Sequence, residues 1–296
     1  MNITDNNMME VQEQNKKKVN RVLSSVYNLP SAPTIIFDVT KIIEDPRSSA
    51  AQLGQLISKD QGLVTKILAV ANSPLYGIPR RVSTIEFAIV ILGFNHIKNI
   101  VIALSMMEAF KDIGDSKFDQ KSYWEHSLLT ATASKRIADD LGIMLSGEIF
   151  TAGLLHDLGI PVIYKYFNKE FKEIEKAVKS GKKTYSQAEM EILGVSHSEL
   201  GEMLIDRWNL PEKLRNTVKF HHNPGAAETD KEIPAVIHLA DYMTVKFGLG
   251  NYKWDEGLEL DKNVIEILNL GAPEYLENFT ETYKNLFESQ LESIKL

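Results

Sequence analysis

The chain has 296 residues, of which 44% are hydrophobic and 25% are charged, a composition typical of a protein that buries a substantial core. Its 33 Lys and Arg residues against 40 Asp and Glu residues give a formal net charge of −7, which disfavours broad binding to nucleic-acid backbones. The sequence contains no cysteine, which excludes disulfides, thiolate nucleophiles and zinc fingers. It therefore favours a reducing compartment, and we expect a cytoplasmic protein.

The beginning of the chain carries neither a signal peptide nor a helical pattern. It lacks the basic start and the apolar middle of a secretory signal, and apolar periodicity begins only at Val19, so residues 1–17 are expected to form a flexible tail. The longest uninterrupted apolar run, residues 87–92, is far shorter than the roughly 20 residues that span a bilayer, so we expect no membrane insertion.

From Val19 onward, apolar residues recur every three to four positions, which is the spacing of amphipathic helices. The first part of the chain predicts helices at about 19–29, 33–45, 48–57, 60–72, 83–92 and 95–110, with a loop at 75–81. The second part predicts helices at about 122–141, 146–164, 168–180, 185–193, 196–208, 211–221, 233–247, 264–270 and 274–296. Ser48 or Ser49 and Asp60 are candidate N-caps. No strand pattern or solenoid repeat occurs, so the predicted fold class is all-α.

A polar stretch at residues 111–121 is the predicted boundary between two helical lobes. In the first lobe, the helix-glycine-helix segment 86–98 is similar to a helix-turn-helix motif. Its second helix is mostly apolar beyond four residues, Asn95, His96, Lys98 and Asn99, which favours a core helix over a DNA reader. The lysines at 16–18 with Arg21 are typical of a solvated helix face. DNA binding is therefore the weakest of three functional hypotheses.

The second lobe holds six of the seven histidines, and two aspartates accompany them. His156 and Asp157 follow the small or apolar run 152–155, and two titratable groups at the end of an apolar helix need partners such as a metal. Asp241 lies one helical turn after His238. Imidazole and carboxylate ligands gathered by facing helices suit divalent metals, so the residue types permit a two-metal site.

Each of the other histidines also has a purely structural interpretation. His126 could be a hydrogen-bonded core residue, and His197 could lie beside a helix N-cap. The pair His221-His222 could end a helix, where positive charge suits the helix dipole. We interpret His238 as a core residue or as one that positions a ligand.

Several motifs together resemble known protein families. His126, the His156-Asp157 pair and Asp241 resemble the H…HD…D signature of the HD superfamily of metal-dependent phosphohydrolases. The HDOD domain family is matched by LPSAP (29–33), SKDQGLVTKILAVANSPLYG (58–77), VSTIEFAIVILGF (82–94), AGLLHDLG (152–159), the helix around His197, WNLPEKL (208–214) and FHHNP (220–224). The resemblance implies an N-terminal helical HDOD subdomain (18–112), an HD-like helical core (118–247) and a C-terminal helical extension (248–296).

The resemblance also implies a metal centre and a role in bacterial signal transduction. By comparison with the related HD-GYP phosphodiesterases, His126, His156, Asp157 and Asp241 would hold a first metal. Asp157 would bridge to a second metal, held by His197, His221 and His222. Such ligands admit one or two divalent ions of Fe, Mn, Zn, Ni or Co.

Two departures from the HD-GYP pattern argue against catalysis. Ile160 stands where the active enzymes have a phosphate-binding lysine, and 223–225 (Asn-Pro-Gly) replace an acidic residue followed by the Gly-Tyr-Pro signature. We therefore expect a non-catalytic regulatory module that carries a metal site and acts on signalling proteins. The alternative is a metal-dependent phosphohydrolase or phosphodiesterase acting on a nucleotide or another phosphate ligand, with His156 and Asp157 as candidate catalytic residues.

Overall fold

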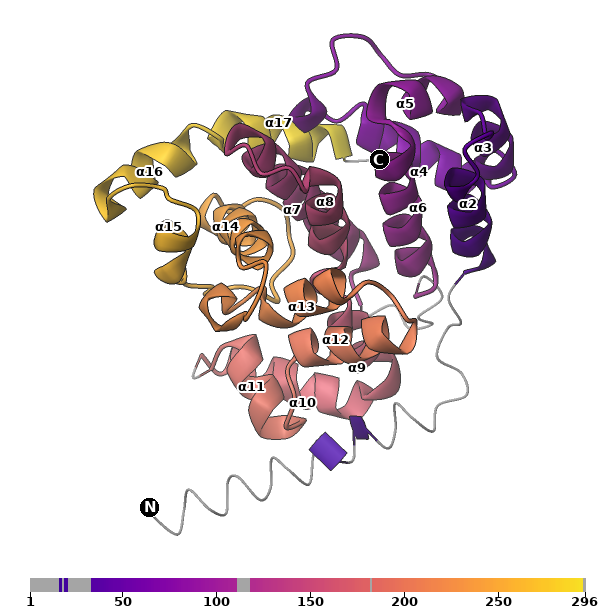
Figure 1. Ribbon diagram of the computed structural model, residues 1–296. Coiled ribbons are helices and arrows are strands. Elements are labelled where there is room, and N and C mark those ends of the chain that lie inside the picture. The colour runs from indigo at the N-terminus through magenta and orange to yellow at the C-terminus, as the bar shows by residue number, and fades with distance from the viewer. Residues whose placement is uncertain (1–15, 18, 21–32, 111–117, 182, 295–296) are drawn as a thin grey trace.

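The computed structural model describes residues 16–17, 19–20, 33–110, 118–181 and 183–294, and every regular element in these ranges is a helix (Figure 1). The α-helices are α2 (Thr34–Glu44), α3 (Ala50–Ile57), α4 (Gln61–Ala71), α5 (Ile85–Leu92), α6 (Phe94–Glu108), α7 (Gln120–Asp140), α8 (Ser146–Leu155), α9 (Gly159–Tyr166), α10 (Asn168–Lys179), α11 (Tyr185–Ile192), α12 (His197–Arg207), α13 (Glu212–Phe220), α14 (Glu232–Lys246), α15 (Asn263–Ile267), α16 (Pro273–Glu281) and α17 (Lys284–Ile294). Two 3-10 helices, η1 (Pro74–Tyr76) and η2 (Pro224–Ala226), complete the set. The predicted all-α class is confirmed.

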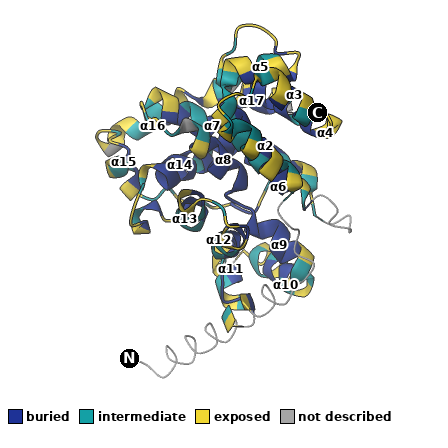
Figure 2. Ribbon diagram, turned by 45° about the vertical axis from the view of Figure 1, so that its right-hand side comes forward, coloured by how far each residue is buried: buried dark blue, intermediate teal, exposed yellow. Residues whose placement is uncertain are grey.

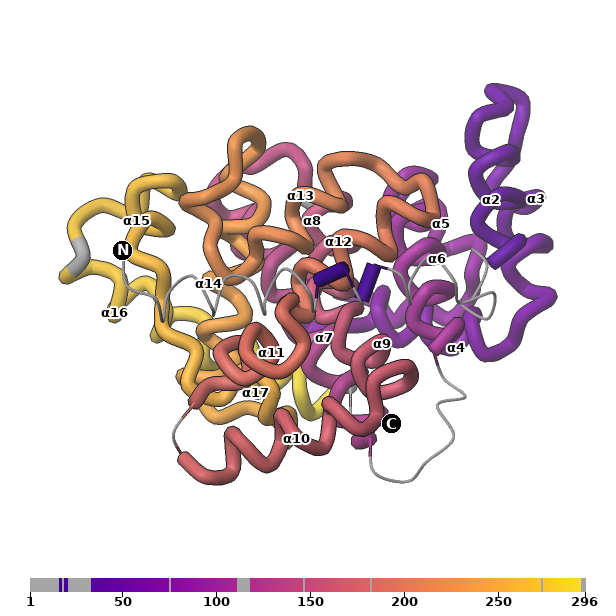
Figure 3. Tube along the Cα trace, turned by 90° about the horizontal axis from the view of Figure 1, so that it is seen from below, coloured from indigo at the N-terminus to yellow at the C-terminus, as the bar shows by residue number. Residues whose placement is uncertain are grey.

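The long helix α7 lies at the centre of the arrangement and packs against α8, α14 and α17. Helix α6 packs against both α2 and α8, and so joins the N-terminal helices to the rest of the protein. Seen from below, α2 and α3 lie at one end of the molecule and α15 and α16 at the other (Figure 3). The last helix, α17, returns to contact η1, so both lobes touch the C-terminal part of the chain.

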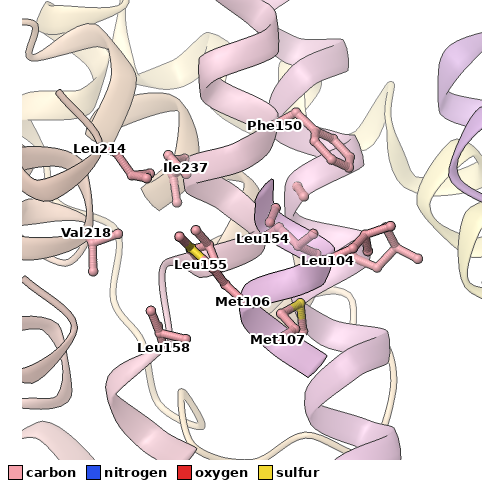
Figure 4. Close-up of a cluster of buried hydrophobic side chains, with 14 of the residues drawn as sticks. Leu104, Met106, Met107, Phe150, Leu154, Leu155, Leu158, Leu214, Val218 and Ile237 are labelled. Carbon is pink, nitrogen blue, oxygen red and sulfur yellow. The ribbon is translucent and has the colours of Figure 1, made fainter. Parts of the chain in front are cut away.

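One contiguous hydrophobic core extends through both lobes. Helices α8, α9 and α14 are largely buried (Figure 2), and Figure 4 shows the side chains at the centre of the core. They come from α6, α8, α13, α14 and the turn after α8: Leu104, Met106, Met107, Phe150, Leu154, Leu155, Leu158, Leu214, Val218 and Ile237. Fully burying such a side chain contributes about 1.5–3 kcal/mol, so this cluster holds the end of α8 firmly in place. The predicted subdomain boundaries, 18–112, 118–247 and 248–296, stay a prediction.

Two of the predicted helix starts are confirmed in atomic detail. The Ser49 hydroxyl accepts a hydrogen bond from the Gln52 backbone, and the Gln52 side chain accepts one from the Ser49 backbone. At the next helix, the Asp60 carboxylate accepts from the Leu63 N–H at 2.9 Å. Each cap contributes on the order of 1 kcal/mol because it satisfies an N–H that the helix leaves unpaired.

Two predicted helices, 146–164 and 274–296, are each divided in the structure. The first ends at Leu155 and α9 begins at Gly159, because Pro161 has no N–H to bond the Asp157 carbonyl in a continuous helix. The apolar pattern resumes directly after the His156-Asp157 pair because both helices are buried. The second is divided at 282–283, where buried Tyr283 donates from its hydroxyl to Asp140 at the end of α7.

Some predicted segments lie outside the described residues. They include most of the tail 1–17 and of the helix 19–29, of which residues 16–17 and 19–20 are helical.

No single helix in the described part of the chain is both long and apolar enough to cross a membrane. Helices α5 and α6 meet that test only as a pair, and the chain bends by 118° between them. Helix α6 buries most of its C-terminal half, including Ile100, Val101 and Leu104, which supports its interpretation as a core helix.

His96 on α6 is a half-buried contact between the two lobes. Its Nε2 lies 2.5 Å from the Tyr76 hydroxyl, and its ring lies 5.6 Å from that of Phe150 on α8. Burial, together with Lys135, lowers the pKa of His96 to about 4, although Asp139 opposes this shift. The folded protein therefore keeps this imidazole neutral at pH values where an unfolded chain protonates it.

This difference predicts a pH-dependent effect of His96→Asn on stability. Between pH 6.5 and 4 the unfolded state binds a proton that native His96 does not, so the wild-type protein loses up to about 3 kcal/mol as the pH falls through this window. The variant has no titrating group at this position. The difference between its free energy of unfolding and that of the wild type therefore shifts in favour of the variant between pH 7 and pH 4.5. Urea unfolding at several pH values measures the difference. A stability difference that is constant with pH would contradict the prediction.

Candidate metal centre

The seven predicted ligands converge from separate elements of the second lobe. His126 lies within α7, His156 and Asp157 in the turn between α8 and α9, His197 at the start of α12, His221 and His222 just after α13, and Asp241 within α14. All are buried except His222, whose side chain is 20% exposed. The structure thus brings the complete predicted set together.

Two glycines allow this convergence because other backbone lies against them. A Cβ on Gly153 would lie 2.8 Å from the Ala131 Cα, so α8 can approach α7 only without a side chain there. A Cβ on Gly159 would lie 1.9 Å from the His197 carbonyl oxygen, which brings the start of α9 against the start of α12. The two glycines flank the turn at residues 156–157 and fix its distance to the other ligands.

A first group of potential ligands surrounds His126. The group consists of His126, His156, Asp241 and Asp255, whose ligand atoms all lie within 4.8 Å of one another. The His126 Nε2 lies 3.3 Å from the His156 Nε2, 3.3 Å from Asp241 Oδ1 and 3.6 Å from Asp255 Oδ2. These atoms could hold a divalent ion with two nitrogen and two oxygen ligands.

A second group lies beside the first and consists of Asp157, His197, His221 and His222. Asp157 Oδ1 lies 3.4 Å from the His197 Nε2 and 3.6 Å from the His221 Nε2. Its other oxygen, Oδ2, lies 3.4 Å from the His156 Nε2, in the first group. Asp157 therefore extends one oxygen toward each group, which is the geometry that the bridging role implied by the resemblance would require.

The outward nitrogens of three histidines make hydrogen bonds that orient the rings. His156 and His221 each donate from Nδ1 to the backbone carbonyl three residues earlier, at 2.6 and 2.7 Å. His197 donates from Nδ1 to the Glu189 carboxylate at 2.9 Å. With Nδ1 protonated, the Nε2 lone pair faces the centre, which is the arrangement that metal-binding histidines require.

Glu189 on α11 is a fully buried acid that the sequence analysis did not select. Besides His197 Nδ1, it accepts from the His197 backbone N–H at 2.7 Å and from the Trp254 indole at 2.5 Å. Burial disfavours a charged His197, but the Glu189 carboxylate outweighs that effect and raises the pKa of His197 to about 9. Glu189 therefore makes this imidazole more basic, and a metal that binds at Nε2 displaces the proton there and gains a stronger ligand.

The electrostatics of the centre favour a cation. Burial lowers the pKa of His156 to about 4, so this ring is neutral and available as a ligand. Burial alone would raise the pKa of Asp157, but His156 and the other histidines lower it well below its usual value. Asp157 Oδ1, the His221 Nε2, both Asp241 oxygens and Asp255 Oδ2 have no hydrogen-bond partner among the described residues. Unsatisfied buried atoms are costly, and a divalent metal satisfies this donor set.

The sequence analysis missed Asp255 as well as Glu189, together with the aromatic residues beside Asp255. The only signal was the tight cluster of Tyr252, Trp254 and Asp255 within a polar segment. The structural interpretation of His238 holds: it donates from Nδ1 to the His221 carbonyl at 2.8 Å and accepts from the Asp261 N–H at 2.9 Å. It supports the backbone between the adjacent ligands His221 and His222.

A cavity of about 330 Å³ opens onto the second group of ligands. His197, His222 and Asp255 lie at its base, and Glu256 and Glu259 line its wall. The lining that the structure describes contains no Lys or Arg, so the opening suits a cation better than a phosphate anion. Ile160, at the position of the missing lysine, is fully buried and apolar.

The contact between Glu189 and His197 predicts a selective loss of metal affinity. Glu189→Gln keeps the size of the side chain but removes the charge that makes His197 basic, so we expect metal to bind 10–100-fold more weakly. Calorimetric titration of the metal-free protein measures this change. Glu191→Gln on the same helix is the control, because its side chain is 59% exposed and pairs with Lys183. Equal affinities in the two variants would contradict the role given to Glu189.

Comparisons with known proteins agree with this architecture. The family model of the HDOD domain matches residues 29–224. An uncharacterized protein of Treponema pallidum (strain Nichols) is 26% identical over 293 residues, and the match covers 95% of this chain and 54% of the relative. The chain thus spans about half the length of the curated relative it matches.

Solved structures share the fold along nearly the whole chain. An HDOD domain protein of unknown function from Geobacter sulfurreducens is 26% identical with a TM-score of 0.76, covering 97% of this chain and 99% of that one. A Shewanella amazonensis protein, provisionally named a phosphohydrolase, is 22% identical with a TM-score of 0.70, covering 92% and 97%. With two thirds of its length matched by the family model, and with the helical fold and converging ligands described above, the chain belongs to the HDOD domain family.

Proposed function

We propose that this protein is a metal-binding regulatory module of the bacterial cytoplasm that acts through protein partners and not by turnover. The observation that carries the proposal is a pair of adjacent four-ligand groups, joined through Asp157, beneath an opening lined by acids. The ligand groups supply the donors for one or two divalent ions. The acidic lining admits cations and repels the phosphate substrates of the related enzymes.

The residues around the centre favour binding over catalysis. A bound metal pair would supply an activated water and would stabilise charge on phosphoryl oxygens. A phosphodiester also needs cationic or hydrogen-bonding side chains to position it, and Ile160 offers neither. The Tyr252 hydroxyl donates to Asp157 Oδ2 at 2.8 Å, so a neutral side chain covers the bridging carboxylate.

We propose that signalling proteins bind the first lobe or its junction with the second. Four large apolar side chains that are exposed in the described part of the chain lie there: Phe37 on α2, Val90 and Ile91 on α5, and Met144 before α8. Ile91 and Met144 line one cavity at the junction, and exposed apolar groups gathered in this way are typical of protein-binding surfaces. The net charge of −7 gives no support to DNA as the partner, and we expect no salt-sensitive binding to duplex DNA.

Elemental analysis tests the proposal, with protein purified without chelators or immobilised-metal resin. We expect near-stoichiometric metal in the wild-type protein, none in a His156→Ala/Asp157→Ala variant, and no turnover of nucleotides, cyclic dinucleotides or generic phosphodiesters. Absence of metal from the wild type would overturn the metal-binding proposal.

The second candidate function is a metal-dependent phosphohydrolase. The complete two-metal ligand set with its bridging aspartate favours it, as does the partial exposure of His222 at the opening. In that case a nucleotide or another phosphate compound is the substrate, and His156 and Asp157 are essential. Turnover of the phosphate-ester panel at an enzyme-like rate, abolished in the double variant, would establish this function and reject the regulatory one.

A further inference from the structure

The covering segment, residues 248–262 between α14 and α15, lies across the metal centre although it is outside the family-matched residues 29–224. It contributes three side chains to the centre or its supports: Tyr252, Trp254 and Asp255. The HD-type ligand pattern recognised in the sequence ends at Asp241, so this segment adds groups that the pattern does not contain.

Asp255 reaches both ligand groups with its two carboxylate oxygens. Its Oδ2 lies 3.6 Å from the His126 Nε2 in the first group, and its Oδ1 lies 3.4 Å from the His222 Nε2 in the second. The side chain is only 4% exposed. Among the described residues, Asp157 is the other carboxylate that extends one oxygen to each group.

Aromatic contacts on the N-terminal side of Asp255 hold it in this position. Trp254 stacks on Tyr185 and Phe171, with ring centroids 4.2 and 5.0 Å apart, and its indole donates to Glu189. Tyr252 also takes part, because its ring stacks on a ligand histidine at 4.4 Å. These contacts place the segment beside the centre, where Asp255 faces both ligand groups.

The surroundings of Asp255 leave one of its oxygens without a partner. Oδ2 is buried and has no hydrogen-bond partner among the described residues, and neither has either oxygen of Asp241 in the same group. Buried polar atoms without partners are costly, and a divalent cation bound by these oxygens would satisfy them.

We propose that Asp255 is an additional metal ligand, and that metal binding through Asp255 fixes the covering segment over the centre. The inference rests on the proposed metal-binding function and deepens it, because it names the element that responds to the metal. Metal occupancy then controls the order of residues 248–262.

Two measurements on the full chain test this inference, with Zn²⁺ as the probe metal. The first compares Zn²⁺ affinity, by chelator competition, in the wild type, Asp255→Asn and the matched control Glu266→Gln, whose exposed side chain lies on α15 and does not line the opening. We expect a loss of at least about tenfold in Asp255→Asn and wild-type affinity in Glu266→Gln. Circular dichroism of the metal-free variants verifies that both are folded.

The second measurement is limited trypsin cleavage after Lys253, inside the covering segment. We expect Zn²⁺ to slow this cleavage in the wild type and in Glu266→Gln. In Asp255→Asn, cleavage should stay fast even at Zn²⁺ concentrations that saturate the variant. Wild-type affinity in Asp255→Asn, or cleavage that Zn²⁺ does not slow in the wild type, would overturn the inference and leave the proposed function standing. A wild-type protein that binds no Zn²⁺ or other divalent metal would overturn both.

Discussion

Loading the metal-free protein with its divalent metal is expected to raise its Tm by about 8 °C at free metal concentrations near 1,000 times the Kd. A ligand that binds only the folded state stabilises it by about 4 kcal/mol under these conditions, and each kcal/mol raises the Tm of a protein of this size by about 2 °C. The folded state is required because the ligands come from α7, α12, α14 and the turns after α8 and α13. Calorimetry before and after addition of a chelator measures the shift.

The matched control for this experiment is the His156→Ala/Asp157→Ala variant, which removes one ligand of the first group and the bridging carboxylate. Its Tm should not respond to metal at the same concentration. A shift of equal size in the variant would show that the metal binds elsewhere in the chain, and the centre described here would then not be the cause of the stabilisation.

Gly159→Ala is expected to destabilise the protein by about 3 kcal/mol or more. The added Cβ would lie 1.9 Å from the His197 carbonyl oxygen, 2.7 Å from its carbon and 2.9 Å from the His197 Cα. All three are backbone atoms, so no side-chain rotation can relieve the overlap, and α9 and α12 must move apart. His197 then leaves the second ligand group, and metal binding weakens together with stability.

Gly62→Ala in α4 is the control for this substitution. A Cβ there meets only the Asp60 carboxylate oxygen, at 3.3 Å, and alanine favours the helix, so we expect a change within about 1 kcal/mol. Denaturant unfolding and metal titration of both variants make the comparison. If Gly159→Ala were as stable as Gly62→Ala, the close approach of α9 and α12 described here would be wrong.

The sequence could single out residues of the candidate centre because several of them stand in a recognisable local context. His156 and Asp157 follow an apolar helix, and His221 and His222 end another, and the resemblance to HD-type motifs implied their roles. Glu189 and Asp255 have no such context. Glutamate and aspartate are rarely buried. These two are buried because α11 packs against the covering segment. Glu189 and Trp254, which form a hydrogen bond across that contact, lie 65 residues apart in the sequence.

The break between α8 and α9 was missed for a related reason. Both helices are buried on nearly all sides, and residues 156–158 between them are fully buried as well, so apolar residues continue on both sides of the His156-Asp157 pair. Pro161 was a local sign of the break, since a proline excludes the hydrogen bond that a continuous helix needs. Periodicity reports which residues are buried, but it does not report where one buried helix ends and the next begins.

Helix α17 connects the C-terminal part of the chain back to the first lobe. This helix follows the covering segment in sequence, packs against α7, and returns to η1 in the first lobe, where the Ser73 hydroxyl donates to the buried Gln290. A hinge motion that separated the lobes would have to detach α17 or stretch the chain that leads to it from the metal centre. The packing of the C-terminal helix against both lobes therefore restricts their motion relative to each other.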